Sequence, residues 1–395
     1  MLEMGIIEPS TAAYASPIVM VRKPDGSNRV CVDYRKLNKI TVFNPEPMPR
    51  MEEIFAELSG SNFYSKFDLS KGYWQIPMKA EDRDVTTFIT HRGLFRFKVM
   101  PYGLVTAPAT FSRLMRKLLD QLKQLKNYLD DVLAHSEAWT GHIQTLREFF
   151  TRVQEANFVL RPSKCFVGFY SLNFFGHNVG SQGLGPTSEM LDKIHRAPPP
   201  TTKKQLRSFL GLVGYYRSFV PNFAAIAVPL TDLTSKGASN ILVWGEAQQK
   251  AFVSLKNYVC NPPVLKLPDV SKEFILQTDA SCEGLGAVLL QEENGVKHPI
   301  AFASKKLLPR ECNYSTIERE ALAIVWGVQK FERFLYGQHF ILETDHQPLQ
   351  YLNNAKFQNG RLMRWALALQ PYRFTVHAIK GCQNVGADFL SRHAC

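Results

Sequence analysis

Strand-like apolar runs and amphipathic stretches are mixed along the first 180 residues. The run from Phe63 to Phe67 reads as a strand, with Asp68 at its carboxyl end. Residues 111–119 place apolar side chains at helical spacing, which predicts an amphipathic helix. Together these patterns predict an α+β unit over residues 1–180.

Two breaks follow this unit. Residues 180–186 are rich in turn formers, which we interpret as a hinge, and residues 197–200 contain three consecutive prolines. After the prolines, Thr202 and Gln205 fit a capping box, and apolar residues recur at helical spacing from Leu206 to Val213. A helix therefore begins near Thr202, inside a smaller helical unit.

A third unit is predicted beyond Pro262. Residues 274–278 and 286–290 read as two strands separated by a short turn. No period of 20 to 50 residues and no low-complexity tract is visible, which argues against a solenoid. The predicted organisation is modular, with domains at 1–180, 181–260 and 261–395.

Composition indicates a globular protein with reduced cysteines and no membrane span. With 395 residues and 45% hydrophobic content, the chain can bury more than one core. No apolar run approaches the ~18 to 20 residues that a membrane span needs, so we expect no membrane partner. Seven cysteines without a Cys-x-x-Cys pair predict reduced thiols rather than disulfides or a zinc site.

The charge balance favours a polyanionic partner. The formal net charge is +12 and the pI is near 9.3, although anionic membranes or simple solubility also explain such values. Residues 181–258 carry nine Lys or Arg against four Asp or Glu, with Tyr215, Tyr216 and Phe219 around Arg217. These residues fit either a groove that touches a nucleic-acid backbone or a helical core with a basic exposed face.

Adjacent acids interrupt a strand-forming run at Asp130 and Asp131. Neighbouring carboxylates repel each other, so a divalent cation is a natural compensation, whereas an isolated pair is more often a solvated hairpin turn. Asp68 is a third acid at a strand end. The three could meet around one metal site.

Four ordered motifs give these acids a context. They lie at residues 29–38, 67–73, 100–104 and 128–131, and they read RVCVDYRKLN, FDLSKGY, MPYGL and YLDD. With them the chain resembles the reverse transcriptases of long-terminal-repeat retrotransposons of the Ty3/gypsy type. The resemblance runs from about residue 5 to residue 392.

The resemblance implies an α+β right-hand polymerase with fingers, palm and thumb, followed by an α/β ribonuclease H-like domain with a mixed sheet. The first residues would fall inside the fingers, which would be truncated at the N-terminus. Asp68 and Asp130 would bind two Mg²⁺ ions most directly, with Mn²⁺ as an alternative. Asp131 would contribute charge or a weaker contact.

The resemblance also assigns the nucleotide pocket. Tyr73 would lie under the incoming sugar and exclude a 2′-hydroxyl, although from its own sequence it could equally be a packed core aromatic. Arg29, assisted by Lys23, would bind the triphosphate through paired phosphate oxygens. Tyr102 would line the pocket, at a position where the family commonly carries Phe.

A second acidic set lies near the C-terminus. Each of these acids alone would be an ordinary surface carboxylate, but their order and local sequence resemble the ribonuclease H quartet, again with two Mg²⁺ ions. Glu318 competes with one of them for the helix position. The four acids are Asp279, Glu320, Asp345 and Asp388.

The function that the resemblance implies is RNA-directed and DNA-directed DNA synthesis with cleavage of RNA in hybrids, within a longer polyprotein. The implied partners are an RNA template, a DNA primer and template, an RNA/DNA hybrid and dNTPs, with a homodimer or other element-encoded proteins as further candidates. An intracellular location, in a cytoplasmic particle or the nucleus, is expected. The alternatives are an inactive fragment and a domesticated nucleic-acid-binding protein.

Overall fold

The computed structural model describes residues 1–22, 26, 28–235, 237, 239–282, 284–345 and 360–379, without the side chains of residues 28 and 29. Its contacts divide the chain into two compact units. The first holds residues 1–54 and 60–172, and the second holds residues 55–59 and 173–395. The domain boundaries expected at residues 180 and 260 remain predictions.

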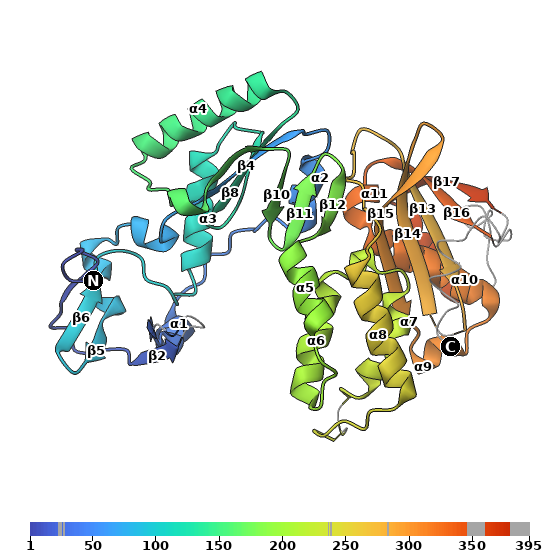
Figure 1. Cartoon of the computed structure of the whole chain (residues 1–395), viewed down its shortest axis with the longest axis horizontal. Helices are drawn as coiled ribbons and strands as arrows, with labels where there is room; N and C mark the ends of the chain where they lie inside the picture. The colour runs from blue at the N-terminus through green and yellow to red at the C-terminus, as the bar shows by residue number, and fades with distance from the viewer. Residues whose placement is uncertain are drawn as a thin grey trace. The chain divides into compact units, whose positions relative to one another are not determined.

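A four-stranded antiparallel sheet forms the centre of the first unit, in the order β7-β8-β4-β9. Figure 1 labels its two middle strands, β8 and β4. Helices α3 and α4 cover one face of it, because Phe67 of β4, Phe111 of α3 and Phe149 of α4 share one buried cluster. The predicted strand and amphipathic helix are confirmed. The elements are β4 (Phe63–Asp68), α3 (Ala107–Leu118), β7 (Leu125–Tyr128), β8 (Asp131–Ser136), α4 (Trp139–Glu155) and β9 (Phe166–Phe169).

Smaller sheets complete the first unit. One has the order β1-β6-β5, and a separate antiparallel pair joins β2 to β3. Tyr34, which precedes α1, is buried, and its hydroxyl donates to the carbonyl of Thr86 at 2.9 Å. The elements are β1 (Ile7–Pro9), β2 (Ile18–Arg22), β3 (Asn28–Val32), α1 (Arg35–Ile40), β5 (Phe88–Thr90) and β6 (Gly93–Phe97); α2 (Met51–Glu57) crosses the division between units.

Two buried histidines lie in a polar network within the first unit. The Nε2 atom of His142 lies 2.7 Å from the Ser65 hydroxyl, and the Nδ1 atom of His135 lies 2.9 Å from the Ser61 hydroxyl. Nε2 of His135 has no hydrogen-bond partner among the described residues. Burial lowers the pKa of His135 to about 4, so its ring is neutral in the folded protein at neutral pH.

This histidine should make the first unit acid-sensitive. The pKa of an unfolded histidine is about 6.5, so below that pH the unfolded chain takes up a proton that folded His135 refuses until about pH 4. The unfolding free energy should therefore fall by about 3 kcal/mol between pH 6.5 and pH 4 on account of this residue. Chemical denaturation of wild type and His135→Gln across this range should give a stability difference that shrinks as the pH falls. A difference independent of pH would contradict the assignment.

Helices dominate the first part of the second unit. Leu206, Phe209 and Val213 of α6 are buried against α8, and the predicted capping box of Thr202 and Gln205 is present. The helices are α5 (Ser188–Arg196), α6 (Lys203–Tyr215), α7 (Phe223–Asp232) and α8 (Glu246–Cys260). Tyr216 and Phe219 are buried core residues, whereas Tyr215 is half exposed, so the core interpretation holds for two of the three aromatics.

The glycine-rich stretch at 180–186 is a strand pair rather than a hinge. Strand β11 (His177–Gly180) pairs with β12 (Gly183–Pro186), next to β10 (Ser171–Phe174). A Cβ atom at Gly183 would lie 2.4 Å from the carbonyl oxygen of Leu265, so glycine is needed here for close approach. Residues 181 and 182 form the turn that the composition indicates, while Gly183 is explained by packing.

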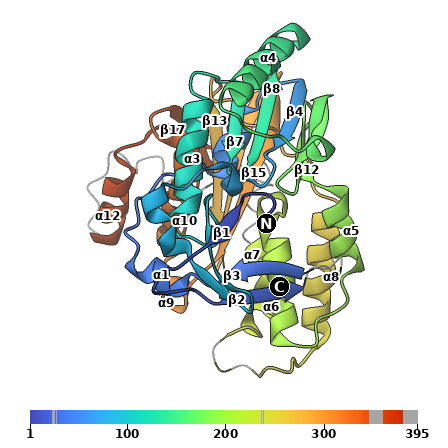
Figure 2. The same cartoon turned by 90° about the vertical axis from the view of Figure 1, so that its left-hand side faces the viewer.

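The second unit also contains a five-stranded mixed sheet, in the order β15-β14-β13-β16-β17. Figure 1 labels all five strands, and Figure 2 labels β13, β15 and β17. Strands β13, β16 and β17 are parallel to one another, while β14 and β15 are antiparallel neighbours. Helix α10 packs closely on it, because a Cβ atom at Gly327 would lie 3.1 Å from Thr278. The elements are β13 (Phe274–Ala280), β14 (Gly284–Glu293), β15 (Val296–Lys306), α9 (Pro309–Cys312), α10 (Thr316–Lys330), α11 (Glu332–Leu335), β16 (His339–Thr344), α12 (Gly360–Leu369) and β17 (Arg373–Ala378).

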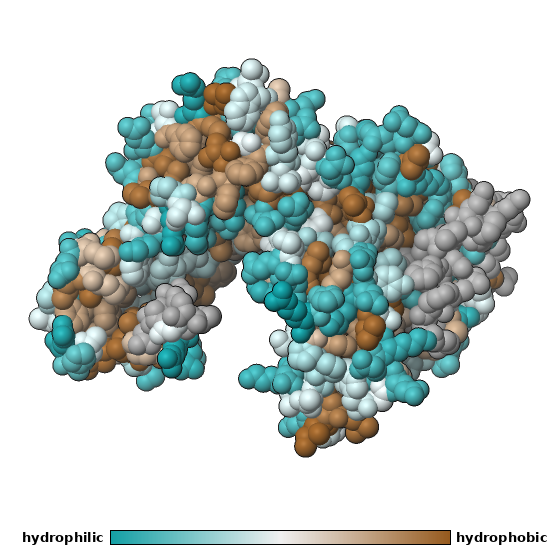
Figure 3. Space-filling model, in the orientation of Figure 1, coloured by the Kyte–Doolittle hydropathy of each residue, from teal (hydrophilic) through white to brown (hydrophobic). Residues whose placement is uncertain are grey.

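Polar side chains cover much of the surface seen in Figure 3, with apolar patches between them. On α4, the apolar side chains of Trp139, Ile143 and Phe150 are exposed. In the part of the chain that the structure describes, no helix combines the length and apolar character needed to cross a membrane.

Candidate active sites

A tight hairpin positions the first pair of acids. Leu129 and Asp130 form the turn between β7 and β8, and Leu129 has a φ of 53°, which is unusual for a non-glycine residue. Asp131 opens β8 and is the register partner of Asp68 at the end of β4. The backbone N–H of Leu69 donates to the carbonyl of Asp130 at 3.0 Å. The three acids that the sequence singles out are thus neighbours along two adjacent strands.

Strand alternation explains which face carries the carboxylates. Phe67 and Val132 point into the core beneath α3 and α4, so Asp68 and Asp131 point to the opposite face of the sheet. Lys66 shares this face because it lies two residues before Asp68. The acidic site therefore lies on the face of the sheet that α3 and α4 leave uncovered.

Two lysines pair with these acids. The Nζ atom of Lys164 lies 3.2 Å from Oδ2 of Asp68, and that of Lys66 lies 3.2 Å from Oδ1 of Asp131. Burial raises the pKa of Asp131, and the nearby charges of Asp130 and Asp68 act in the same direction, while Lys66 opposes them. The lysines thus offset part of the repulsion among the carboxylates.

The three polymerase acids do not form a tight three-carboxylate cluster. Among the described residues, one group of three metal-ligating side chains has its ligand atoms within 4.8 Å of one another. That group is the second acidic site, described below, and it does not include Asp68, Asp130 or Asp131. At the first site the ion pairs turn Asp68 and Asp131 toward different lysines. The metal-binding role of Asp68, Asp130 and Asp131 therefore stays a prediction.

Aromatic residues adjoin Asp130. The rings of Tyr73 and Tyr102 are 5.2 Å apart between centroids, and Tyr73 also packs edge-on against buried Phe111 at 5.4 Å. Burial raises the pKa of Tyr73, and the charge of Asp130 adds to this effect. The side chain of Arg29 and all of Lys23 lie outside what the structure describes.

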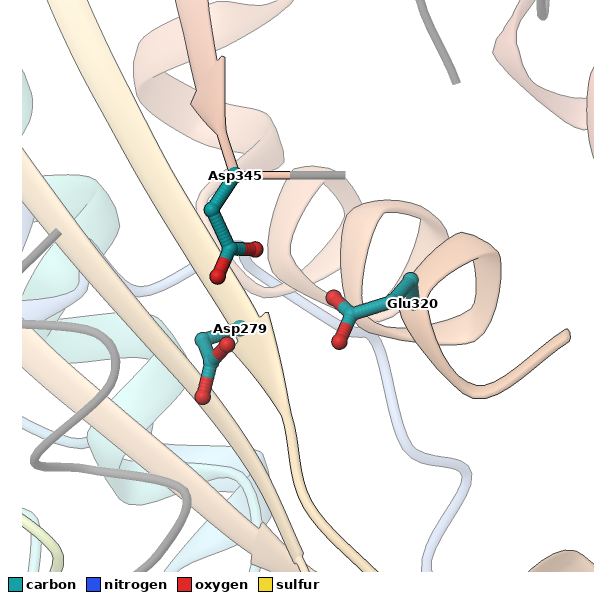
Figure 4. A group of neighbouring side chains, drawn as sticks. All are labelled: Asp279, Glu320 and Asp345. Carbon is teal, nitrogen blue, oxygen red and sulfur yellow. The ribbon is translucent and has the colours of Figure 1, made fainter. Parts of the chain in front are cut away.

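Parallel strand ends create the second acidic site. Asp279 lies near the end of β13 and Asp345 directly follows β16, and the register pairs Gln277 with Glu343, two residues before each acid. Because β13 and β16 are parallel, both acids reach the same edge of the sheet. Glu320 projects from α10 toward them, and Figure 4 shows the three side chains converging.

Burial and mutual repulsion determine the electrostatics of this cluster. Asp279 and Glu320 are buried, and burial together with the charges of Asp279 and Asp345 raises the pKa of Glu320 to about 9. Atom Oε2 of Glu320 is buried without a hydrogen-bond partner among the described residues. Three converging carboxylates that repel one another fit a hard divalent cation.

Glu318 has a separate structural role. Its carboxylate forms a capping box with Ser315 at the start of α10 and pairs with Arg361 at 2.7 Å. It therefore does not compete with Glu320 for the acidic cluster. Asp388, the fourth predicted acid, lies outside the described residues.

Family comparisons match both parts of the chain. Residues 21–179 match the family described as reverse transcriptase (RNA-dependent DNA polymerase), and residues 269–372 match the RNase H-like domain found in reverse transcriptase. The Pol polyprotein of transposon 297 from Drosophila melanogaster is 42% identical over 99% of this chain, and the Tf2-3 polyprotein of Schizosaccharomyces pombe is 34% identical over 99% of it. The chain carries the reverse transcriptase and ribonuclease H-like domains found in Ty3/gypsy-type retrotransposon Pol polyproteins.

The chain covers only part of these retrotransposon polyproteins, namely 37% of the transposon 297 protein and 30% of the Tf2-3 protein. Solved structures of the foamy viral protease-reverse transcriptase are similar to it. The complex with double-stranded DNA has a TM-score of 0.88, with 26% identity over 96% of this chain and 80% of that chain. The complex with an RNA/DNA hybrid has a TM-score of 0.84, with 26% identity over 96% of this chain and 52% of that chain. The expected polymerase and ribonuclease H-like folds are confirmed.

The sequence analysis of this Pol-type chain did not identify Lys66 and Lys164. These lysines form ion pairs with Asp131 and Asp68. For Lys66 a signal was available, because a lysine two residues before Asp68 on a strand must share its face. For Lys164 no signal was available, because 96 residues separate it from Asp68. Asn38, the last residue of the first motif, is a third omission. Its side-chain amide bonds the backbone of Gly103 and Val105, in the segment that contains Tyr102.

Proposed function

We propose that this chain is an RNA-directed and DNA-directed DNA polymerase that also cleaves RNA in RNA/DNA hybrids. The observation that carries the proposal is the presence of two separate acidic sites, one in each family-matched part of the chain. The foamy viral relatives bound to double-stranded DNA and to an RNA/DNA hybrid support nucleic-acid substrates of these two kinds. The basic net charge of +12 agrees with a polyanionic substrate.

We further propose that both sites use Mg²⁺, two ions at each. Oxygen-only donor sets of this kind suit Mg²⁺ or Mn²⁺. When bound, such ions activate the attacking hydroxyl or water and neutralise charge on the leaving oxygen. The residues that would hold them are Asp68, Asp130 and Asp131 at the polymerase site, and Asp279, Glu320, Asp345 and Asp388 at the nuclease site.

The remaining pocket residues would bind and select the nucleotide. Tyr73 would lie beneath the sugar, held between Phe111 and Tyr102. Arg29 and Lys23 would pair with the triphosphate of the dNTP, since a guanidinium binds two phosphate oxygens at once. Tyr102 would form part of the pocket wall.

The purified chain should extend a labelled DNA primer on an RNA template and cleave the RNA strand of a hybrid in Mg²⁺. EDTA should abolish both reactions, and added Mn²⁺ should restore them, because both sites depend on cations to offset carboxylate repulsion. Gel analysis of labelled primer and labelled RNA separates the two activities. A chain that binds the hybrid but performs neither reaction would favour the domesticated binding protein instead. A chain without a cooperative unfolding transition would favour the inactive fragment.

A further inference from the structure

The side chain of Asn38 connects α1 to the segment that carries Tyr102. Its Nδ2 atom donates to the carbonyl of Gly103 at 2.8 Å, and its Oδ1 atom accepts from the backbone N–H of Val105 at 2.9 Å. The amide nitrogen and the amide oxygen of Asn38 thus each form a hydrogen bond with a backbone group within three residues of Tyr102. A side chain bonded in this way fixes the backbone path between residues 103 and 105.

The segment also packs against Val32 and Tyr34. Gly103 has a φ of 101°, and a Cβ atom there would meet Tyr34 at 3.4 Å and the carbonyl of Val32 at 3.5 Å. Tyr34 is itself held by the hydrogen bond from its hydroxyl to Thr86. The position of Tyr102 thus depends on α1 and on the residues that lead into it.

Tyr102 in turn lies against the residue proposed to select the sugar. Its ring is 5.2 Å from that of Tyr73 and 6.0 Å from that of Trp74. Phe111, which is fully buried, supports Tyr73 from another direction. Tyr102 is partly exposed, whereas Phe111 is fully buried. The ring of Tyr73 can therefore shift more easily toward Tyr102 than toward Phe111.

We infer that Asn38 is a positioning residue for sugar selection: its amide holds residues 103–105 so that Tyr102 keeps Tyr73 in place under the nucleotide. The inference rests on the proposed polymerase function and on the proposed role of Tyr73. Asn38 would thus affect sugar selection although it lies in the motif at residues 29–38, away in sequence from Tyr73 and Tyr102.

The test compares kcat/KM for a deoxynucleotide with kcat/KM for the matching ribonucleotide. Asn38→Ala should lower this ratio on the order of tenfold, as expected when two hydrogen bonds that restrain a segment are lost. Tyr73→Ala should lower this ratio further, and its value shows how much discrimination is lost when the proposed sugar-selecting ring is removed. Asn62→Ala is the matched control, because Asn62 also donates from its amide to a backbone carbonyl, that of Glu137, elsewhere in the same unit. This control should leave the ratio unchanged.

A second measurement is independent of catalysis. Amide hydrogen exchange of residues 102–105 should be faster in Asn38→Ala than in wild type and unchanged in Asn62→Ala. If Asn38→Ala does not fold, Asn38→Asp replaces it, since that variant keeps the acceptor for Val105 and loses the donor to Gly103. If no wild-type extension is seen, the polymerase proposal fails, while unchanged exchange would separately overturn the role of Asn38. Equal losses for both sugars, or an unchanged ratio in Tyr73→Ala, would also overturn it.

Discussion

Asp130→Asn should abolish primer extension and leave RNA cleavage at the wild-type rate. Asp130 lies in the turn between β7 and β8, beside Tyr73 and next to Leu69, the residue that follows Asp68. Among the residues that the structure describes, the lysines at this site pair with Asp68 and Asp131 rather than with Asp130. Of the three acids, it is therefore the one most readily available to a cation. Removing its charge should lower the extension rate on the order of 10³-fold, because several kcal/mol of charge stabilisation is lost.

The substitution should not disturb the fold. Asparagine has nearly the same shape as aspartate, and the hydrogen bond from Leu69 uses the backbone carbonyl of Asp130, which the substitution retains. Single-turnover extension of a labelled primer measures the effect. Asp120→Asn, an exposed acid just beyond α3 in the same unit, serves as the matched control and should extend normally. A fall of tenfold or less in Asp130→Asn would mean that this carboxylate is not a metal ligand.

The sequence predicts local structure well where one residue pattern decides it. Strand β4 ends at Asp68, the helix after the prolines begins with the Thr202 capping box, and strands β13 and β14 appear where apolar runs indicate them. Each of these depends on side-chain periodicity or on a hydrogen bond within a few residues. The ordering of the acidic motifs likewise needs no tertiary information.

Features that depend on distant contacts were not predictable. Residues 180–186 read as a hinge because glycine is a turn former, yet Gly183 is required there by the carbonyl of Leu265, 82 positions further on. The lysines that pair with Asp68 and Asp131 are likewise determined by how strands and loops come together. Sequence spacing shows which acids exist, but not which cations they face in the folded chain.

The same distinction separates the two acidic sites. At the nuclease site the register of parallel strands β13 and β16 carries Asp279 and Asp345 to one edge, so convergence follows from backbone geometry alone. At the polymerase site Asp68 and Asp131 are also register partners, but lysine side chains compete for their carboxylates. An ion that bound Asp68 and Asp131 would therefore displace existing ion pairs, whereas the three carboxylates of the nuclease cluster already lie together.

Asp345→Asn should accordingly abolish RNA cleavage while primer extension continues. The three carboxylates of the nuclease cluster lie within 4.8 Å of one another, and Asp345 is the least buried of them. Its loss should lower the cleavage rate on the order of 10³-fold, since one of the few oxygen ligands at the site is removed. Cleavage of a hybrid labelled on the RNA strand measures this effect. The matched control is Asp192→Asn, which changes an exposed acid on α5.

The same variant should reveal the repulsion among the carboxylates when no divalent ion is added. Without divalent ions, Asp345→Asn should have a higher Tm than wild type, because one of the charges that raise the pKa of Glu320 is gone. Added Mn²⁺ should then raise the Tm of the variant less than that of wild type, since ions bind the folded state through fewer ligands. Cleavage reduced tenfold or less, together with an equal Mn²⁺ effect on both proteins, would show that Asp345 does not bind the ions on which cleavage depends.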